Sequence, residues 1–251
     1  MADNDGPVSR RAPRRTDKVG QLVARSILDE MTRGGLEPGT RLPAEAQMMV
    51  DYQVGRGTLR EALRILEVNG LITIKPGPGG GPTVEAATTH DFGRMATMFF
   101  HARGLTLREL IEARLVMEPV AARLAAQRRT DDDIVKLQKL IDFEEKGDED
   151  AYVASTSDFH ELIAEVGGNG VIAIFTESLA EVFHARVRGI LFPPGKPRRQ
   201  VVSTHAAIAQ AIIDGDAETA EKLMLEHMEA YVRYVEKSHP TLMAELIDWI
   251  H

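Results

Sequence analysis

A helical pattern that changes within a few residues into a β-hairpin pattern places the strongest constraint on the fold of this chain. In residues 55–68, apolar side chains recur every three or four positions, which predicts a helix with one buried face. The run LITIK follows at 71–75, and PGPGGG then leads into PTVE, which predicts two short strands joined by a tight loop. Two further helical patterns precede this stretch, at 16–33 and 43–52. Three helices followed by a hairpin predict a winged helix-turn-helix domain over residues 16–85.

The apolar positions and glycines of this domain predict which side of each helix is buried. A GG pair ends the first helix, and Gly70 lies where a left-handed cap of the third helix belongs. The residues expected to be buried are Val19, Leu22, Val23, Ile27 and Met31 on the first helix and Leu59, Ala62, Leu63 and Leu66 on the third.

The rest of the chain has helical patterns throughout, so the predicted fold class is mostly α. Residues 105–251 predict an all-α bundle of six or seven helices, without a strand pattern. Residues 86–104 are interpreted as a linker leading into a helix, because apolar residues cluster towards its end. Residues 1–15 are polar and aperiodic, which predicts a disordered basic arm that either contacts phosphates or is simply solvated. The bundle helices are expected at 106–127, 130–146, 149–166, 170–190, 197–214 and 216–236, with a short one near 240–250.

The formal net charge of −8 is unevenly distributed along the sequence. Residues 7–76 contain 12 Lys and Arg against 8 Asp and Glu, whereas residues 89–251 contain 18 against 27. A basic front part and an acidic rear part predict two tasks, with nucleic acid as the partner of the basic part. The absence of cysteine excludes disulfides and thiolate metal sites. No apolar run is long enough for a membrane span, so we expect a cytoplasmic protein that does not bind membranes.

Three arginines lie four residues apart in the third predicted helix. Arg56, Arg60 and Arg64 share one side of it, away from the apolar side. In a helix-turn-helix the first half of this helix enters the major groove, where an arginine binds guanine or a phosphate. Thr58 is placed to contact a phosphate or a thymine methyl group. The alternative, an ordinary solvated helix face, does not account for the hairpin and the regional charge, so the predicted partner is double-stranded DNA.

Around these residues the chain resembles a known family. RLPAEAQMM and GRGTLREALRILEVNGLITIKPGPGG resemble the signature of GntR-type bacterial regulators, in which a recognition helix precedes a glycine-tipped wing. TLRELIEARLVMEPVAARLAA, DFHELIAEVGGNGVI and STHAAIAQAIIDGDAETAEKLMLEHM resemble parts of the FCD domain, the ligand-sensing domain of the FadR subfamily. The resemblance covers nearly the whole chain. It implies a homodimeric transcription factor that binds operator DNA and whose helical domain binds a small effector.

The resemblance also assigns candidate DNA-binding residues by position. Those that match family residues contacting operator DNA are Arg56, Thr58 and Arg60. Gly77 matches the glycine at the tip of the wing. The family often has a base-reading arginine after the acid of PAE, but this chain has Ala46 there, and Arg41 in the preceding turn is the remaining candidate for that contact. The mode of DNA binding therefore transfers more readily than the target sequence.

Three histidines lie in the apolar stripes of three different predicted helices: His160, His205 and His227. One histidine in such a stripe is more often a core residue than a ligand. Three in one bundle favour a bound ion, because buried imidazoles need partners. Three imidazole nitrogens suit a divalent metal such as Zn²⁺ or Ni²⁺, with coordination positions left open.

The resemblance qualifies this metal site. Metal-containing members of the FadR subfamily use three such histidines and an aspartate four residues before the first, but that position is Thr156 here. Asp158 is two residues from His160, so it is expected to point away from the site. Two alternatives remain open: a weaker three-histidine site completed by water or an effector carboxylate, and a domain that binds its effector without a metal.

Arg114 interrupts the apolar stripe of the first helix of the bundle. A buried guanidinium needs a partner, which is either an internal glutamate or an anionic effector. If Arg114 and the histidines share a cavity, the effector is expected to be a small carboxylate, whereas an acyl compound would need a deep apolar slot.

The function expected from the sequence is that of a non-enzymatic transcriptional regulator, a repressor, whose affinity for operator DNA changes when the effector binds. The change is expected to reach the two DNA-binding domains of a homodimer through residues 86–104. Two alternatives remain: a metal-dependent hydrolase, although no HExxH motif is present, and an architectural DNA-binding protein without an effector.

Overall fold

The computed structural model describes residues 15–77, 79–146, 149–187 and 196–249, except for the side chains of residues 15–17, 149–157 and 196–198. The chain divides into two compact units between Thr88 and Thr89, and each unit has its own core. Apart from Arg15, where the first helix begins, the basic arm expected at residues 1–15 lies outside the described residues.

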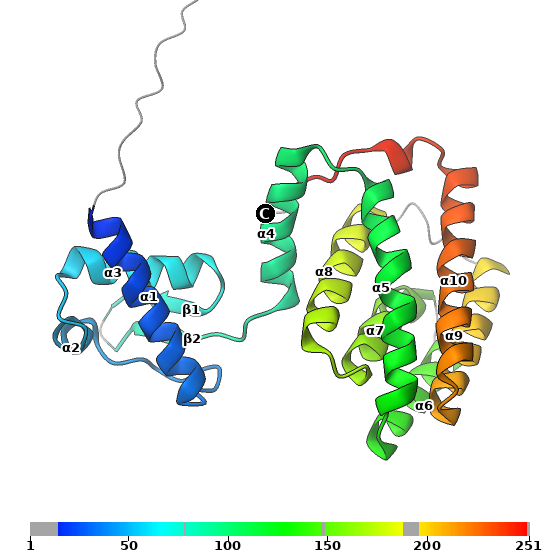
Figure 1. Cartoon of the computed structure of the whole chain (residues 1–251), viewed down its shortest axis with the longest axis horizontal. Helices are drawn as coiled ribbons and strands as arrows, with labels where there is room; N and C mark the ends of the chain where they lie inside the picture. The colour runs from blue at the N-terminus through cyan, green and yellow to red at the C-terminus, as the bar shows by residue number, and fades with distance from the viewer. Residues whose placement is uncertain (1–14, 78, 147–148, 188–195, 250–251) are drawn as a thin grey trace, which may run out of the picture. The chain divides into compact units, whose positions relative to one another are not determined.

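The N-terminal unit is the winged helix-turn-helix that the sequence predicts (Figure 1). Its elements are α1 (Arg15–Arg33), α2 (Glu45–Asp51), α3 (Arg56–Val68), β1 (Ile72–Lys75) and β2 (Gly81–Val84). The strands pair antiparallel, with Ile72 opposite Val84. Gly70 has a φ of 71°, as expected for a left-handed cap after α3. The buried face of α3 consists of Leu59, Ala62, Leu63 and Leu66, as predicted.

The buried face of α1 differs from the expected one. Val19 is 39% exposed and Leu22 is 63% exposed, so the prediction that both are buried is wrong. Small residues decide this orientation: Gly20 is buried, and a Cβ atom there would lie 3.1 Å from Cγ of Glu61 on α3. Because α1 presents its glycine to α3, the two helices approach closely and Leu22 turns towards solvent. The apolar residues that α1 does bury are Val23, Ala24, Ile27 and Met31.

The C-terminal unit contains seven α-helices within the described residues (Figure 1). They are α4 (Thr89–Arg103), α5 (Leu107–Arg128), α6 (Asp131–Lys146), α7 (Glu149–Val166), α8 (Gly170–Val187), α9 (Lys196–Asp214) and α10 (Ala217–Ser238). Helix α5 packs against α7, α8, α9 and α10, so it is the central helix of the bundle. It begins at a capping box in which the Thr106 side chain accepts from the Glu109 amide and Glu109 accepts from the Thr106 amide.

Two segments differ from the sequence-based expectation. Residues 89–103 of the expected linker form α4, which packs against α8 within the C-terminal unit. Residues 240–250 were expected to be helical, but the described part contains only the 3-10 turn η1 (Leu242–Ala244). The chain after η1 is extended because the backbones of Glu245 and Ile247 hydrogen-bond to residues 107 and 105 at the start of α5, at 3.0 and 2.9 Å. We call residues 242–247 the C-terminal strap; its side chains at Leu242, Met243 and Ile247 are buried.

Candidate DNA-binding face and candidate metal centre

Helix α3 presents its arginines to solvent on a different side from its buried leucines. Arg56, Arg60 and Arg64 are all exposed, and Thr58 between them is half-buried. Among the described residues, none of the three arginines has an acidic partner within 4.0 Å. Some other exposed arginines do have one, as Arg33 and Arg108 show. The α3 face therefore carries positive charge that the protein itself does not neutralise, which suits phosphates and guanine edges.

Two local features fix the position of α3. Gln53, in the turn between α2 and α3, has a φ of 52°, which lets the two short helices cross within a few residues. The Tyr52 hydroxyl donates a hydrogen bond of 2.7 Å to Glu30 on α1. Partial burial and this bond to a carboxylate raise the pKa of Tyr52, so the hydroxyl remains a hydrogen-bond donor well above neutral pH. Helix α3 thus packs on α1 and α2, and the Tyr52–Glu30 hydrogen bond joins α2 to α1 beside it.

Glycines shape the loop between β1 and β2. Gly77, Gly79 and Gly81 all have positive φ values, where a side chain would be strained. Gly80 is constrained differently, because a Cβ atom there would lie 2.1 Å from the carbonyl oxygen of Lys75. Gly77 is exposed, and no atom lies within 4 Å of the position of a Cβ atom there. Gly77 and Gly79 thus offer backbone without side chains, which suits close approach to a groove.

Arg41 is not on α3 with the other arginines but beside the β-hairpin. Its backbone bridges to Thr83 of β2, which puts it at the base of the hairpin, and its side chain is exposed. Ala46 is exposed on α2. Of the candidates for DNA contacts, α3 therefore holds Arg56, Thr58 and Arg60, whereas Arg41 and Gly77 belong to the hairpin region.

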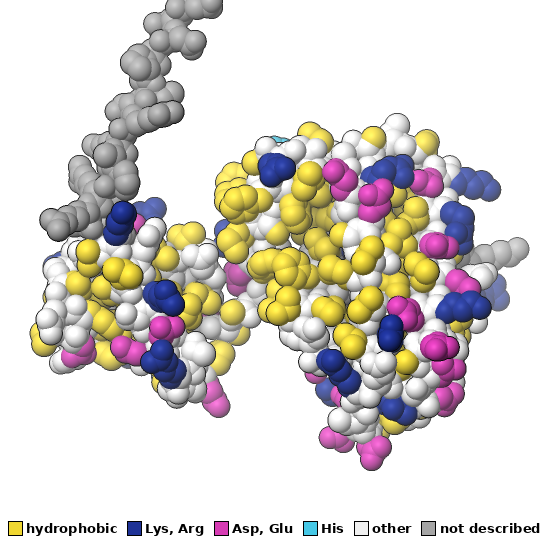
Figure 2. Space-filling model, in the orientation of Figure 1, with side chains coloured by type: hydrophobic (Ala, Val, Ile, Leu, Met, Phe, Trp, Pro, Cys, Tyr) yellow, Lys and Arg dark blue, Asp and Glu magenta, His cyan; other side chains and the backbone are white. Residues whose placement is uncertain are grey.

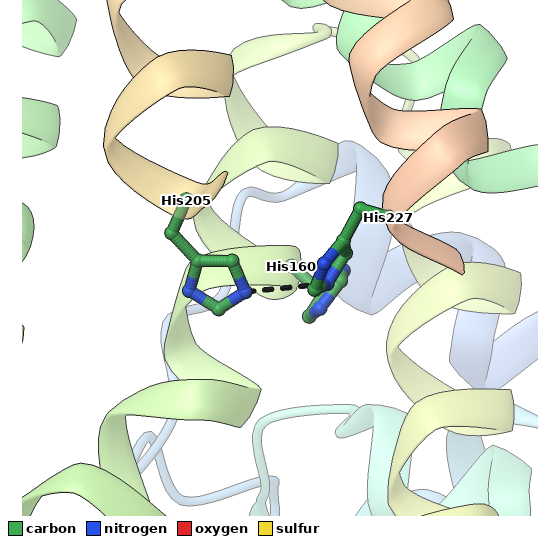
Figure 3. A group of neighbouring side chains, drawn as sticks. All are labelled: His160, His205 and His227. Carbon is green, nitrogen blue, oxygen red and sulfur yellow. Dashed lines mark hydrogen bonds between the residues drawn. The ribbon is translucent and has the colours of Figure 1, made fainter. Parts of the chain in front are cut away.

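In the C-terminal unit the structure brings together the three histidines that the sequence singles out (Figure 3). His160 comes from α7, His205 from α9 and His227 from α10, and one ring nitrogen of each lies within 4.8 Å of the others. His160 and His205 are buried, and His227 is half-buried. The Nε2 atoms of His205 and His227 are 3.3 Å apart.

This spacing fits a bound divalent ion. Two nitrogens that bind the same tetrahedral ion at about 2.0–2.1 Å are separated by roughly 3.3 Å. The His205–His227 distance of 3.3 Å matches that edge, and the nitrogen of the third ring lies within 4.8 Å of both. Burial, followed by the neighbouring histidines, lowers the pKa of His205 well below 6.5. Burial and His160 likewise lower the pKa of His227 to about 3. Both imidazoles are therefore neutral at pH 7 and have lone pairs available for a metal.

Two buried glutamates beside the histidines were not identified from the sequence. Glu144 of α6 is fully buried, and its two oxygens lie 3.0 and 2.9 Å from Nδ1 of His205. Glu118 of α5 is also buried, and its Oε2 lies 2.5 Å from Nδ1 of His160. The signal was present: Glu144 follows Leu137 by seven residues in the apolar stripe of α6, and a charge in such a stripe requires a buried partner.

The structure shows an internal acid as the partner of Arg114. The Nε atom of Arg114 donates a 2.6 Å hydrogen bond to Oε1 of Glu118, and the two side chains are 3% and 1% exposed. The guanidinium also lies 5.3 Å from the ring centre of Phe183. Burial alone would raise the pKa of Glu118, but Arg114 and His160 together hold it well below its usual value. Arg114, Glu118 and His160 thus form a row of neighbouring polar side chains that leads from α5 to the histidine cluster.

The candidate aspartate ligands remain outside this cluster. Asp158 is exposed, as expected from its position two residues before His160. The side chain of Thr156, in the position of the subfamily's aspartate, is not among the described residues. Within the described part of the chain, the group of metal-ligating side chains consists of the three histidines alone.

Comparisons with known proteins agree with both units. The family "Bacterial regulatory proteins, gntR family" matches residues 20–80, and the FCD domain family matches residues 109–230. In the described part of the chain, no helix has the length and apolar character needed to cross a membrane.

The chain is similar to individual proteins over most of its length. An L-lactate dehydrogenase operon regulatory protein of Escherichia coli K12 is 34% identical over 86% of this chain and 84% of its own. The transcriptional repressor NanR of Klebsiella aerogenes is 28% identical over 88% and 86%. The structure of a GntR protein of Streptococcus agalactiae has the same fold, with a TM-score of 0.68 and 24% identity over 85% of this chain and 99% of that one. The chain therefore belongs to the GntR family of bacterial transcription regulators and, through its FCD domain, to the FadR subfamily.

Proposed function

We propose that this regulator represses transcription by binding a short palindromic operator, and that a small anionic effector in the FCD domain changes its affinity for that operator. The observation that carries the proposal is the exposed arginine face of α3, which has no acidic partner among the described residues. Repression is also the activity named for the similar NanR protein. Because a bacterial operator lies in the cytoplasm, we propose that the protein acts there.

The DNA-binding residues of this proposal are Arg56, Thr58 and Arg60 on α3, with Arg41 and Gly77 at the hairpin. An operator half-site can be obtained by selecting bound duplexes from a random pool. In fluorescence-anisotropy titrations, Arg60→Ala should weaken binding to that duplex by about 1–3 kcal/mol if the arginine reads a base. Arg33→Ala is the matched control, because it removes the same charge from the exposed end of α1. Equal affinities for wild type and Arg60→Ala would contradict the role of α3.

The effector proposal includes a divalent ion held by His160, His205 and His227. A bound ion would supply a Lewis acid centre that can accept an effector carboxylate, in a domain that already holds Arg114 nearby. Purified protein should contain close to one Zn²⁺ or Ni²⁺ ion per chain by elemental analysis, and His205→Ala should lose it. His239→Ala, a histidine outside the cluster, is the control. Protein that stays metal-free after incubation with these ions, and whose melting temperature they do not change, would contradict the site.

We further propose a homodimer that forms through the apolar side of α4 and α8. Figure 2 shows hydrophobic side chains gathered on the side of the C-terminal unit where these helices lie. The exposed large residues there are Met95, Met98 and Phe99 on α4 and Val171, Ile174 and Phe175 on α8. The two helices pack against each other, and Phe92 of α4 contacts Phe175 at 5.2 Å between ring centres. An exposed apolar patch of this kind usually marks an interface.

The interface can be tested by the mass of the protein in solution. Phe99→Glu should convert the dimer to a monomer in light scattering after size-exclusion chromatography. Phe143→Glu places the same charge at a phenylalanine of similar exposure on α6, and should leave the dimer intact. A monomeric wild-type protein would overturn the homodimer, and a dimeric Phe99→Glu variant would overturn this location of the interface.

A further inference from the structure

Glu144 occupies an unusual place for a charged side chain. It is fully buried on α6, and both of its oxygens face the same atom, Nδ1 of His205 on α9. His205 is equally buried. The contact therefore joins a carboxylate to one side of the imidazole, while the other side faces His227.

This contact bears on which nitrogen of His205 carries the proton. An ionised carboxylate only accepts hydrogen bonds, so beside an ionised Glu144 the Nδ1 atom of His205 donates. In a neutral imidazole the other nitrogen, Nε2, then has a free lone pair. That Nε2 atom is the one 3.3 Å from Nε2 of His227. The ring plane is fixed as well, because the His205 ring stacks on Phe159 with 3.8 Å between ring centres and 6° between planes.

We infer that Glu144 is a positioning residue for the proposed metal site, which holds His205 in the tautomer and orientation that present Nε2 to the ion. The inference rests on the metal site proposed above. A carboxylate behind a metal-bound histidine makes the imidazole a better donor and offsets part of the charge that the ion brings into the core. Glu118 stands in a similar place behind His160, at 2.5 Å from its Nδ1, but it is shared with Arg114. A Glu118 variant would therefore disturb the contact with Arg114 as well, and for this reason the test is made at Glu144.

Three variants separate positioning from a merely structural role. Glu144→Gln keeps an oxygen that can accept from Nδ1 but removes the charge. Glu144→Leu removes the acceptor and keeps the volume. Glu145→Gln changes the adjacent, exposed glutamate of the same helix and is the matched control. Each variant is first compared with wild type by circular dichroism, so that folded protein is used in every measurement.

Two readouts are then made on the full chain. The first is the ¹⁵N spectrum of the histidine rings in metal-free protein, which reports the protonated nitrogen of His205 directly. The second is the affinity for Zn²⁺ by competition with a chelator, together with the visible spectrum of the Co²⁺ form. We expect a proton on Nδ1 of His205 in wild type, Glu144→Gln and Glu145→Gln, and its loss from that position in Glu144→Leu. Zn²⁺ affinity should fall by about 10–100-fold in Glu144→Leu, by less in Glu144→Gln, and not at all in Glu145→Gln.

The outcomes distinguish this inference from the metal proposal. A proton on Nε2 of His205 in the wild-type protein would overturn the inference, whatever the protein binds. Unchanged Zn²⁺ affinity and an unchanged Co²⁺ spectrum in Glu144→Leu would overturn it too. If wild type binds neither Zn²⁺ nor Co²⁺, the metal proposal fails, and the inference fails with it even where the ring spectrum shows the expected tautomer. If Glu144→Leu does not fold, the comparison of Glu144→Gln with Glu145→Gln decides: equal Zn²⁺ affinities overturn the inference, and a loss confined to Glu144→Gln supports it.

Discussion

Removing either partner of the buried Arg114–Glu118 pair should destabilise the C-terminal unit far more than removing both. The two side chains are 3% and 1% exposed, so water cannot solvate a charge that is left behind. The described residues place no second acid within 4.0 Å of Arg114. Breaking a buried pair on one side costs about 3–5 kcal/mol, whereas replacing both partners by uncharged groups is close to neutral. We therefore expect Arg114→Met and Glu118→Gln each to lower the free energy of unfolding by about 3–5 kcal/mol.

The double variant is the decisive measurement. If the single effects were independent, their sum would be about 6–10 kcal/mol, which is comparable with the whole stability of a typical domain. We expect the double variant to lose much less than this sum, with a coupling of at least about 3 kcal/mol. The only tryptophan of the chain, Trp249, belongs to the C-terminal unit, so its fluorescence during urea unfolding reports on that unit. A coupling below about 1 kcal/mol would refute the view that the two charges stabilise each other rather than the fold separately.

Three further results are expected. Gly80→Ala should destabilise the N-terminal unit by about 1–3 kcal/mol in hydrogen exchange, because its Cβ atom would lie 2.1 Å from the Lys75 carbonyl, whereas Gly57→Ala should not destabilise it. Leu63→Ala should cost the same unit about 2–5 kcal/mol, since Leu63 is fully buried in its core. Metal-free protein should lose stability as the pH falls from 6.5 towards 3. In that window the unfolded chain binds a proton that His227, with a folded-state pKa of about 3, does not. Acid titration monitored by Trp249 fluorescence should show a smaller loss in His227→Gln, and an equal loss would disprove the contribution of His227.

The periodic spacing of apolar residues was enough to predict most of the fold. The stripe of α3 and the change of period at β1 are local, so the sequence alone predicted the winged helix-turn-helix and its buried leucines. The face of α1 depends instead on how closely α1 and α3 approach, and that distance is set by Gly20 and its neighbour Glu61. The pattern of apolar residues does not count glycine as a position that packs against another helix. It therefore predicted Leu22 as buried, although Leu22 is 63% exposed.

The candidate metal centre was only half predictable for a related reason. Each histidine can be identified from the sequence as a polar residue in an apolar stripe, and the structure brings all three together. Their partners depend on which helices become neighbours. Glu144 reaches His205 because α6 packs against α9, although 61 residues separate them in sequence. Arg114, by contrast, has its partner one helical turn away on α5, and the sequence already offered a glutamate as one of its two alternatives.

The C-terminal strap has a consequence for how the two units are made during translation. The N-terminal unit has its own hydrophobic core within residues 15–88, so it can fold once that stretch has left the ribosome. The bundle lacks part of its core until Leu242, Met243 and Ile247 have been synthesised, since these side chains are buried beside the start of α5. For more than a hundred residues of synthesis, a complete N-terminal unit is therefore joined to an incomplete C-terminal unit.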